Sequence, residues 1–510
     1  MSFDLASLNF TNGLRIDSEL SFGNEFDSSG AGDFNHDGYA DVIMGAPDFN
    51  NSRGRACVIF GGISHPAVLS LAALNGANGT CFHGVTDFDN QGKAVASVGD
   101  LNDDGIDDIA IGSTLLDADV VDNGGIHILF GHAGAFPAVQ SLDAINGNNG
   151  FTFAGRNAGD QLGISVASAG DVNGDGRDDL VIGSEDEYSR RGAAYVLFGK
   201  STPWSSRMTP ADIDGIVGFR LLGARNIYGL GRAVGGLDFD GDGFSDIIAG
   251  TTFGGIGNQN GSASVVYGHA GTFPAQLDVA TLNGTNGRAF FGTTSFERLG
   301  EQAANAGDIN GDGIDDLMIS APFTDHGGAD AGSMYIVFGS RQRGPAQMFS
   351  SGIFGRVGFR MDGFDADGYC GQRQRRIGDI NGDGVEDIVV GCNYSAGGGT
   401  HRGSAHALFG NAAPMAAATS ATVATVVLGD QDATFVLAEA AAVHYLDSQP
   451  FAGAAISSTP SVASGTWSFR QSNSGPFQPI PVGLSVSSAL VLRKSASRHP
   501  PIFSAMCGWR

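Results

Sequence analysis

One nonapeptide, Asp-x-(Asn/Asp)-x-Asp-Gly-x-x-Asp, constrains the fold of this chain more than any other feature of its sequence. It occurs six times, at residues 33–41, 100–108, 171–179, 238–246, 308–316 and 379–387. Positions 1, 5 and 9 are always Asp, position 3 is Asn or Asp, and position 6 is always Gly. Oxygen side chains at alternate positions around a glycine turn are the ligands that a hard cation such as Ca²⁺ prefers. The nonapeptide therefore predicts metal-binding loops, with up to six bound Ca²⁺.

The predicted ligands are the side chains at positions 1, 3, 5 and 9 and the backbone carbonyl at position 7, with water completing the shell. A carbonyl ligand explains why the residue type varies at position 7. In chain order they are Asp33, Asn35, Asp37, Tyr39, Asp41; Asp100, Asn102, Asp104, Ile106, Asp108; Asp171, Asn173, Asp175, Arg177, Asp179; Asp238, Asp240, Asp242, Phe244, Asp246; Asp308, Asn310, Asp312, Ile314, Asp316; and Asp379, Asn381, Asp383, Val385, Asp387. The alternative is an Asx-rich turn without metal, in which the converging carboxylates would repel one another without compensation.

The start of the nonapeptide is also that of an EF-hand loop, so this alternative needs a test. An EF-hand requires a bidentate Glu at position 12 and a helix leaving the loop. Position 12 here is apolar in every copy, and the residues that leave the loop, such as 109–111 and 388–390, are strand formers without helical periodicity. The sequence therefore excludes an EF-hand and places each loop in a β-hairpin.

The spacing of the loops predicts the architecture. Successive loops begin 67, 71, 67, 70 and 71 residues apart, which is a repeat of about 69 residues. Each repeat contains a small-residue strand before the loop, a β-run after it, a third strand ending in Phe-Gly or Tyr-Gly, a Leu-x-x-Leu-Asn-Gly type of linker, and a fourth strand. Four strands per repeat without intervening helices predict an all-β fold, a β-propeller of four-stranded blades.

The ends of the repeat region predict how the ring closes. The last repeat supplies three strands, whereas residues 5–16 match a linker and a fourth strand. We therefore expect residues 10–18 to provide the outer strand of the blade formed by residues 370–410, which gives six blades in residues 1–410. A seventh blade built from residues 411–450 is the alternative.

The character of the chain changes after the repeats. Residues 411–426 are rich in Ala and Thr and are predicted to be a linker. Residues 427–492 alternate apolar and polar positions, which favours a β-sandwich-like module, and we expect this module to be truncated. Residues 493–510 continue no pattern and are expected to form an irregular tail.

Charge and cysteine content limit the class of protein. The formal net charge is −26, and six Ca²⁺ would bring it to about −14, since each ion adds two charges. A net-negative surface argues against nucleic-acid binding. There is no apolar run long enough to span a membrane, and the N-terminus lacks the pattern of a signal peptide. The five cysteines are too widely spaced for a zinc motif, and we expect most of them to be buried free thiols.

Other polar residues are weaker candidates for a functional role. The two copies of Gly-His-Ala-Gly place His132 and His269 after a third strand, where the geometry of the repeat explains them better than catalysis. Four acidic residues next to the ligands are expected to add electrostatic field rather than bonds: Asp103, Asp107, Asp178 and Asp315. No catalytic motif is present, and neither is a phosphate-binding glycine-rich loop. We therefore expect no catalytic residues and no enzymatic activity.

The combination of Phe-Gly, the chelating hairpin and Gly-Ala-Pro (residues 45–47) resembles the FG-GAP repeats of the integrin alpha-subunit propeller. The resemblance covers roughly residues 5–410 and is closest to bacterial secreted or surface proteins with tandem repeats. It implies calcium binding, an extracellular or cell-surface location, and a role in adhesion or in binding a protein or glycan ligand. Seven blades with calcium in only some would be the integrin pattern, whereas here all six repeats have complete loops.

Two alternatives to adhesion follow from the same resemblance. A phospholipase specific for glycosylphosphatidylinositol carries similar repeats beside a separate catalytic domain, so this chain could be the accessory part of a hydrolase. It could also be a structural spacer in a larger surface protein. In each case Ca²⁺ is expected to stabilise the hairpins and so the fold, with direct bridging of a partner by the ion as the alternative.

Overall fold

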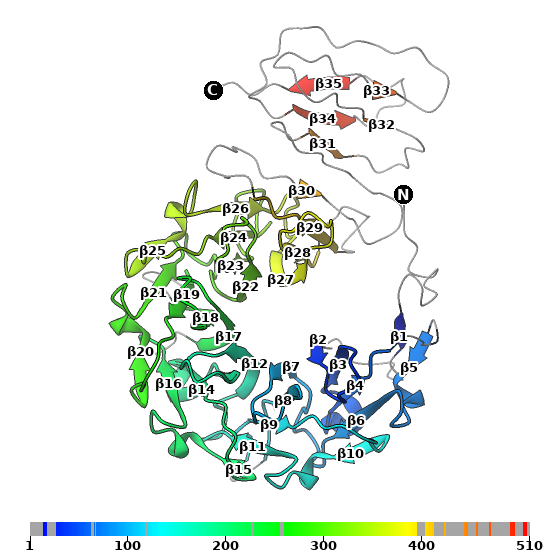
Figure 1. Ribbon diagram of the computed structural model, residues 1–510. Helices are drawn as coiled ribbons and strands as arrows, with labels where there is room; N and C mark the ends of the chain where they lie inside the picture. Colours follow the sequence, from blue (N-terminus) through cyan, green and yellow to red (C-terminus); the bar gives the residue numbers. More distant parts are fainter. Residues whose placement is uncertain are drawn as a thin grey trace.

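Six sheets of similar topology follow one another along the chain and are arranged as a ring (Figure 1). The computed structural model describes residues 14–17, 27–62, 66, 68–117, 121–225, 229–254, 260–394 and 403–412, and short strands beyond them. In each sheet the first strand, at the centre of the ring, leads into the nonapeptide, and the next two or three strands follow outward by antiparallel pairing. This arrangement confirms the predicted propeller of four-stranded blades.

The strands of the blades, from the centre outward, have the following bounds. Blade 1 contains β2 (Asp27–Gly32), β3 (Asp41–Ala46), β4 (Arg55–Ile59) and β6 (Gly79–His83); blade 2 contains β7 (Ala94–Gly99), β8 (Asp108–Ser113), β9 (Gly125–Leu129) and β11 (Gly150–Ala154). Blade 3 contains β12 (Leu162–Gly170), β13 (Asp179–Ser184), β14 (Ala193–Leu197) and β16 (Gly218–Leu222); blade 4 contains β17 (Leu230–Leu237), β18 (Asp246–Thr251), β19 (Ser262–Val266) and β21 (Gly287–Phe291). Blade 5 contains β22 (Ala303–Gly307), β23 (Asp316–Ala321), β24 (Ser333–Val337) and β26 (Gly358–Asp362); blade 6 contains β27 (Cys370–Gly378), β28 (Asp387–Cys392), β29 (Ser404–Leu408) and β30 (Val423–Ala424).

The linkers tie neighbouring blades together. Four short linker strands pair in parallel with the outer strand of the preceding blade: β10 (Val139–Ser141), β15 (Arg207–Met208), β20 (Gln276–Asp278) and β25 (Gln347–Phe349). A 3-10 turn follows each of these linker strands, and another follows β5 (Val68–Ser70). The turns are Leu71–Ala73, Leu142–Ala144, Pro210–Asp212, Val279–Thr281 and Ser350–Gly352. Two short helical segments, α1 (Phe49–Ser52) and α2 (Glu187–Arg190), connect the second and third strands of blades 1 and 3.

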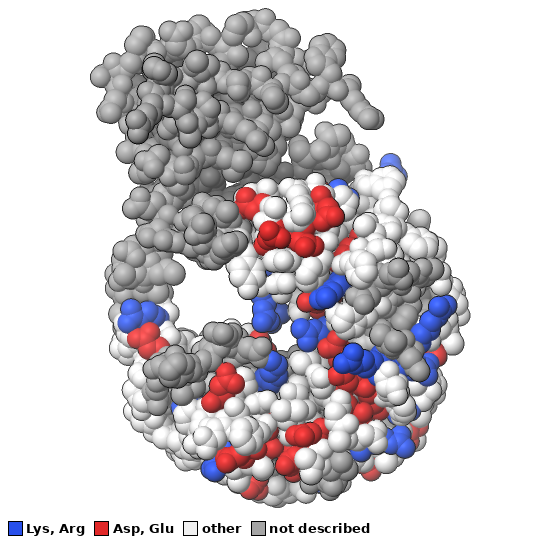
Figure 2. Space-filling model, turned by 180° about the vertical axis from the view of Figure 1, so that it is seen from behind, with Lys and Arg blue, Asp and Glu red and all other residues white. Residues whose placement is uncertain are grey.

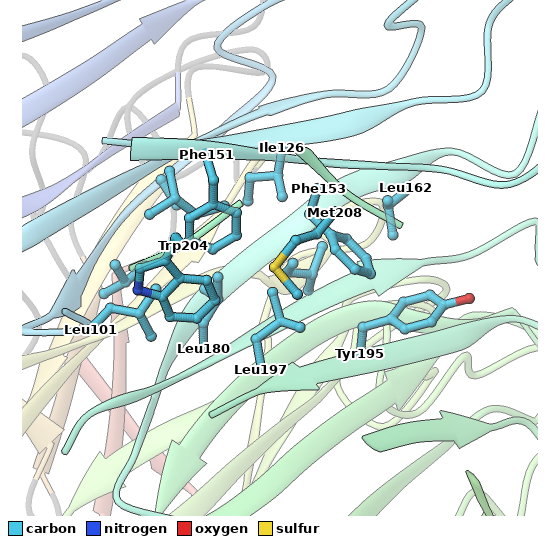
Figure 3. Close-up of a cluster of buried hydrophobic side chains, with 14 of the residues drawn as sticks. Leu101, Ile126, Phe151, Phe153, Leu162, Leu180, Tyr195, Leu197, Trp204 and Met208 are labelled. Carbon is cyan, nitrogen blue, oxygen red and sulfur yellow. The ribbon is translucent and has the colours of Figure 1, made fainter. Parts of the chain in front are cut away.

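The hydrophobic core is divided among the interfaces between blades. Between blades 2 and 3, for example, Phe151 and Phe153 of β11 pack against Leu180, Tyr195 and neighbouring side chains (Figure 3). The second strand of blade 3, β13, is buried at every position because blades cover both of its faces. This double coverage explains why the second strands read as continuous apolar runs rather than as an alternating pattern.

The ring is open between its last and first blades in the part of the chain that the structure describes (Figures 1 and 2). Val42, which faces this seam from blade 1, is 40% exposed, whereas its counterparts in the later blades are fully buried. Ile380 of blade 6 is 56% exposed, whereas the equivalent residues of the other loops are at most 1% exposed. Across the seam, Arg375 of β27 lies 3.8 Å from Asp27 of β2. Among the described residues, no blade therefore covers the two apolar surfaces that face the seam.

The predicted closure by an N-terminal strand is not observed. The strand β1 (Arg15–Asp17) pairs in parallel with β5, and β29 has β30 as its outer neighbour among the described residues. The pairing of β1 with β5 has the same form as the pairing of each outer strand with the linker strand of the next blade. Thus β1 has the position of an outer strand, but the structure does not join it to β29. Residues 10–13 and 18 lie outside the described residues.

The cysteines contradict the expectation of free thiols. Cys57 of β4 and Cys81 of β6 form a disulfide, and so do Cys370 of β27 and Cys392 of β28. In both cases the two residues are direct partners in an antiparallel strand pair. Direct cross-strand partners have neighbouring Cβ atoms, and this proximity cannot be seen from the wide spacing in the sequence. Cys507 lies outside the described residues.

Beyond residue 412, the structure describes β30 and five further strands. These are β31 (Val443–Leu446), β32 (Ala455–Ile456), β33 (Phe469–Arg470), β34 (Leu490–Lys494) and β35 (Phe503–Met506), which form a sheet of order β31-β34-β35 and a β32-β33 pair. Most of the predicted linker (411–426), sandwich-like module (427–492) and tail (493–510) lies outside the described residues, as does most of the alternative seventh blade. These domain assignments stay predictions.

Candidate metal-binding loops

Each nonapeptide connects the first and second strands of a blade, so all six loops lie at the same end of their blades. In the third loop, the carboxylate of Asp171 (position 1) accepts hydrogen bonds from the backbone N–H groups of Asp175 (3.0 Å) and Gly176 (2.8 Å). The same two bonds recur at position 1 of the other five loops. Position 1 therefore lies at the centre of the turn, with the glycine at position 6 folded back over it.

Positions 3 and 5 also turn their oxygens toward the loop. The carboxylate at position 5 accepts a hydrogen bond from the N–H of position 7 in all six loops, as Asp175 does from Arg177 at 3.1 Å. In four loops the side-chain oxygen of the Asn at position 3 accepts from the N–H of position 5. These local bonds hold the predicted side-chain ligands together before any ion is considered.

The Asp at position 9 joins the loop to the third strand. One oxygen of Asp179 accepts from the N–H of Val172 and the other from the N–H of Gly199, both at 2.9 Å. Equivalent pairs of bonds occur in every loop. Gly199 is the glycine of Phe-Gly, and a Cβ there would lie 2.4 Å from the carbonyl oxygen of Asp178. The Phe-Gly motif thus provides a glycine that can approach the loop closely.

Burial makes five of the position 9 carboxylates difficult to ionise. Burial raises the pKa of Asp41 to about 6 and those of Asp108, Asp179, Asp246 and Asp316 to about 8, against the opposing effect of their N–H bonds. Neighbouring carboxylates add to the increase; for Asp179 they are those of Asp175 and Asp171. Carboxylates that share a site in this way need a cation if all are to be charged.

The donor set fits a hard divalent cation. Among the described residues, three carboxylates with ligand oxygens mutually within 4.8 Å occur in the fourth loop, at Asp238, Asp240 and Asp246. Asp240 is 3% exposed and its Oδ1 atom has no hydrogen-bond partner. The other loops have Asn at position 3, so they contain one carboxylate fewer. A carboxylate oxygen has two lone pairs, and its N–H bond therefore leaves capacity for a metal. The contribution of the position 7 carbonyls stays a prediction.

The acidic residues next to the ligands form bonds, contrary to the expectation that they add only field. Asp107, at position 8 of the second loop, accepts the N–H of Asp33 in the first loop at 2.7 Å. Asp178 and Asp315 do the same for the N–H groups of Asp100 and Asp238, at 3.1 and 3.2 Å. Asp103 pairs with Arg177 at 2.9 Å.

A second bond between blades also recurs at the loops. In blades 2 to 6, the residue after Phe-Gly or Tyr-Gly donates its N–H to the carbonyl at position 2 of the preceding loop, as in His132 to Phe34 (3.1 Å) and Lys200 to Leu101 (3.0 Å). Each of the first five loops is thus part of the joint between two blades. His132 and His269 stack on Phe136 and Phe273, at 4.0 and 4.2 Å between ring centroids, as parts of these joints.

Comparison with known proteins finds similar repeats elsewhere. The model of the FG-GAP repeat family matches residues 27–58, 162–197, 230–267 and 300–337, which are four of the six predicted repeats. Integrin alpha-4 of Xenopus laevis is 29% identical over 238 residues, which are 46% of this chain and 20% of the integrin. Phosphatidylinositol-glycan-specific phospholipase D of Rattus norvegicus is 31% identical over 197 residues, which are 36% of this chain and 21% of the phospholipase.

The similarity is therefore confined to part of each relative. Integrin alpha-PS2 of Drosophila melanogaster, 32% identical over 162 residues, is matched over 31% of this chain and 10% of its own length. The chain thus spans about a fifth or less of the length of these relatives. The chain nevertheless contains FG-GAP repeats that form blades of a β-propeller, and over these repeats it is similar to integrin alpha subunits.

Proposed function

We propose that this protein is an extracellular or cell-surface propeller, stabilised by Ca²⁺ in its six loops, that binds a protein or glycan ligand in adhesion. The observation that carries the proposal is the recurrent loop geometry. In each loop a buried carboxylate at position 9 lies beside the carboxylates at positions 1 and 5, and all the side-chain donors are oxygens. Such a set suits Ca²⁺, which takes six to eight oxygen ligands.

The position of the loops supports a stabilising role for the ion. The loops contribute hydrogen bonds to the joints between blades, as Asp33 and Asp107 do between blades 1 and 2. An ion that binds only the folded loop shifts the equilibrium toward the folded state. Because the first five loops each contact the next blade, we expect this stabilisation to reach the ring rather than remain within one hairpin.

The disulfides support export from the cytosol. Two disulfides in the described residues, Cys57–Cys81 and Cys370–Cys392, fix the first and last blades internally. Structural disulfides form and persist chiefly in oxidising compartments. In the described part of the chain, no helix is long and apolar enough to cross a membrane.

The face opposite the loops offers aromatic side chains to a ligand. Phe88 and Phe296 precede the first strands of blades 2 and 5, so they lie at the far end of those strands from the metal loops. They are 66% and 56% exposed, and their φ angles are +72° and +67°. A bulky residue with positive φ is uncommon and costs conformational energy. Exposed aromatics held in this conformation favour a binding role.

A second group of aromatic rings lies at the same end of blades 5 and 6. Tyr369 is 5.3 Å from Phe323 and 5.8 Å from Tyr394 between ring centroids, and the guanidinium of Arg298 lies 4.4 Å from the Phe323 ring. Aromatic rings with polar tips provide contact area together with hydrogen bonds. We therefore place ligand binding on this face.

Thermal unfolding with and without chelator tests the stabilising role. We expect removal of Ca²⁺ to lower the melting temperature, because uncompensated carboxylates then remain in the joints. Asp175→Ala should weaken one site and leave the other loops able to bind. An identical melting curve in calcium and in chelator would refute the proposal.

Glycan and protein arrays probed with the calcium-loaded protein test the ligand face. The double variant Phe88→Ser/Phe296→Ser should lose binding. The matched control is Ile216→Ser, since Ile216 is 77% exposed but precedes the outer strand β16 at the loop end of blade 3. Equal loss in both variants, or none in either, would place the ligand elsewhere.

A second candidate function follows from one observation, the similarity to phosphatidylinositol-glycan-specific phospholipase D. The propeller would then be the accessory part of a hydrolase rather than an adhesion module. Assay of phosphodiesterase activity on glycosylphosphatidylinositol, for the protein alone and with added candidate catalytic chains, separates the two functions.

A further inference from the structure

The fourth loop differs from the other five in its charge and in its neighbour. It has carboxylates at positions 1, 3, 5 and 9, namely Asp238, Asp240, Asp242 and Asp246, where the other loops have Asn at position 3. Three of these carboxylates have ligand oxygens within 4.8 Å of one another, and Oδ1 of Asp240 is buried without a partner. Four like charges in one loop need more compensation than three.

A side chain from the next blade supplies part of that compensation. Nε of Arg343 lies 2.5 Å from Oδ2 of Asp240, and its Nη2 lies 3.0 Å from Oδ2 of Asp242. Its Nη1 donates to the carbonyl of Thr285 at 2.9 Å, and the guanidinium lies 4.7 Å from the Tyr267 ring. The arginine is therefore held in place by contacts on several sides and bridges two predicted metal ligands.

No other described linker offers a cation at this position. Arg343 is the fourth residue after Gly339, the glycine of the Phe-Gly that follows β24. Its linker lies over the fourth loop through the bond from Ser340 N–H to Phe239 O. The equivalent residues in the linkers over the first three loops are uncharged: Ala135, Pro203 and Thr272.

The arginine also replaces a bond that the fourth loop lacks. In four of the other loops, the amide nitrogen of the Asn at position 3 donates to Oδ2 of the Asp at position 5, at 2.9–3.2 Å. Asp240 has no such donor, and Nη2 of Arg343 donates to Asp242 instead. In formal charge, the four carboxylates and the arginine sum to −3, which is also the sum of the three carboxylates in each of the other loops.

We infer that Arg343 is a built-in competitor for the divalent cation, so that the fourth loop is a gated site that binds Ca²⁺ only when the guanidinium leaves Asp240 and Asp242. This inference rests on the proposed binding of Ca²⁺ by the loops. The fourth site is then the weakest in the wild-type protein, although its own ligands carry the most negative charge. When calcium is absent, the guanidinium of Arg343 is the positive charge that compensates the carboxylates at the joint between blades 4 and 5.

The test compares Arg343→Gln with the wild type by calcium titration calorimetry and by thermal unfolding. We expect the variant to bind Ca²⁺ at the fourth loop at least about tenfold more tightly, since a positive charge next to the ligands is removed. We also expect its melting temperature to be lower than that of the wild type in chelator but equal or higher in saturating calcium. This reversal would not arise if the arginine were only a structural contact.

Two controls isolate the effect. Arg341→Gln removes the same charge from the same linker, but Arg341 contacts the carbonyl of Gly241 rather than a carboxylate, so its calcium affinity should change little. Asp238→Ala assigns the fourth site in the titration, and adding Arg343→Gln to it should not alter the remaining sites. If Arg343→Gln fails to fold, Arg343→Lys keeps the charge but cannot bridge two carboxylates, and it should bind more tightly than the wild type.

The outcomes separate this inference from the proposed function. If the five other loops bind Ca²⁺ but Arg343→Gln leaves the fourth site unchanged or weaker, or lowers the melting temperature equally in both conditions, the gate is refuted and the function stands. If no loop binds Ca²⁺ in any variant, both are refuted.

Discussion

Replacing Asp179 by Asn should have opposite effects on stability in chelator and in calcium. Asp179 is fully buried, and burial together with Asp175 and Asp171 raises its pKa from 3.8 to about 8. A raised carboxyl pKa means that the folded state holds the proton more tightly than the unfolded state. Without metal, stability is therefore fully present below about pH 4 and is lost as the pH rises toward 8.

The magnitude follows from this shift. Between pH 3.8 and pH 7 the wild type loses about 4 kcal/mol at this residue, at about 1.36 kcal/mol for each of 3.2 pH units. Asn does not ionise, so it avoids this loss, but its amide nitrogen cannot accept one of the N–H bonds from Val172 and Gly199. An unsatisfied buried N–H costs about 1–3 kcal/mol. At pH 7 in chelator the variant should therefore be more stable than the wild type by about 1–3 kcal/mol.

In calcium the sign should reverse, because the variant loses a charged ligand and binds the ion in the third loop less tightly. Denaturant unfolding followed by circular dichroism, at pH 7 in chelator and in millimolar calcium, measures both values. The matched control is Asp175→Asn, since the Asp175 side chain is 35% exposed and its change should matter mainly in calcium. If Asp179→Asn destabilises the protein equally in both conditions, the idea that these carboxylates lack compensation without metal is wrong.

Two further predictions test the pH response and the seam. Glu187 is 1% exposed, and burial raises its pKa to about 7 against the opposing effect of the hydrogen bond from Tyr195. The free energy of unfolding should therefore fall as the pH rises from about 4.5 to 7, and Glu187→Gln should flatten this slope in unfolding measured across that range. An unchanged slope would contradict the assignment. Ile109→Ser should lower the free energy of unfolding by several kcal/mol, because Ile109 is fully buried between blades. Val42→Ser should lower it by less than about 1 kcal/mol, because Val42 faces the seam. Equal losses in parallel melts would show that another part of the molecule covers Val42.

The local features of the fold could be predicted from the sequence. The nonapeptide places its ligands within nine residues, and the bonds that shape the loop, such as Asp171 to Gly176, join residues at most five apart. The blades could also be predicted, because the same strand pattern and a Phe-Gly or Tyr-Gly after the third strand recur in every repeat. These features depend on patterns within a single repeat, and the same patterns occur in every repeat.

Contacts between blades could not be predicted in the same way. Asp107 and Asp33 are 74 residues apart, and Arg343 and Asp240 are 103 apart, so only the ring brings them together. The disulfide between Cys57 and Cys81 depends on the pairing register of β4 with β6. The N-terminal strand matched a fourth strand in pattern, but the pattern did not specify its partner, which is β5.

The number of calcium ions bound per chain tests the central claim most directly. Native mass spectrometry of the intact protein, titrated with calcium after treatment with chelator, resolves each bound ion by its mass. We expect six ions at saturation, with one of them added last. A protein that remains folded and binds none in millimolar calcium would contradict the account.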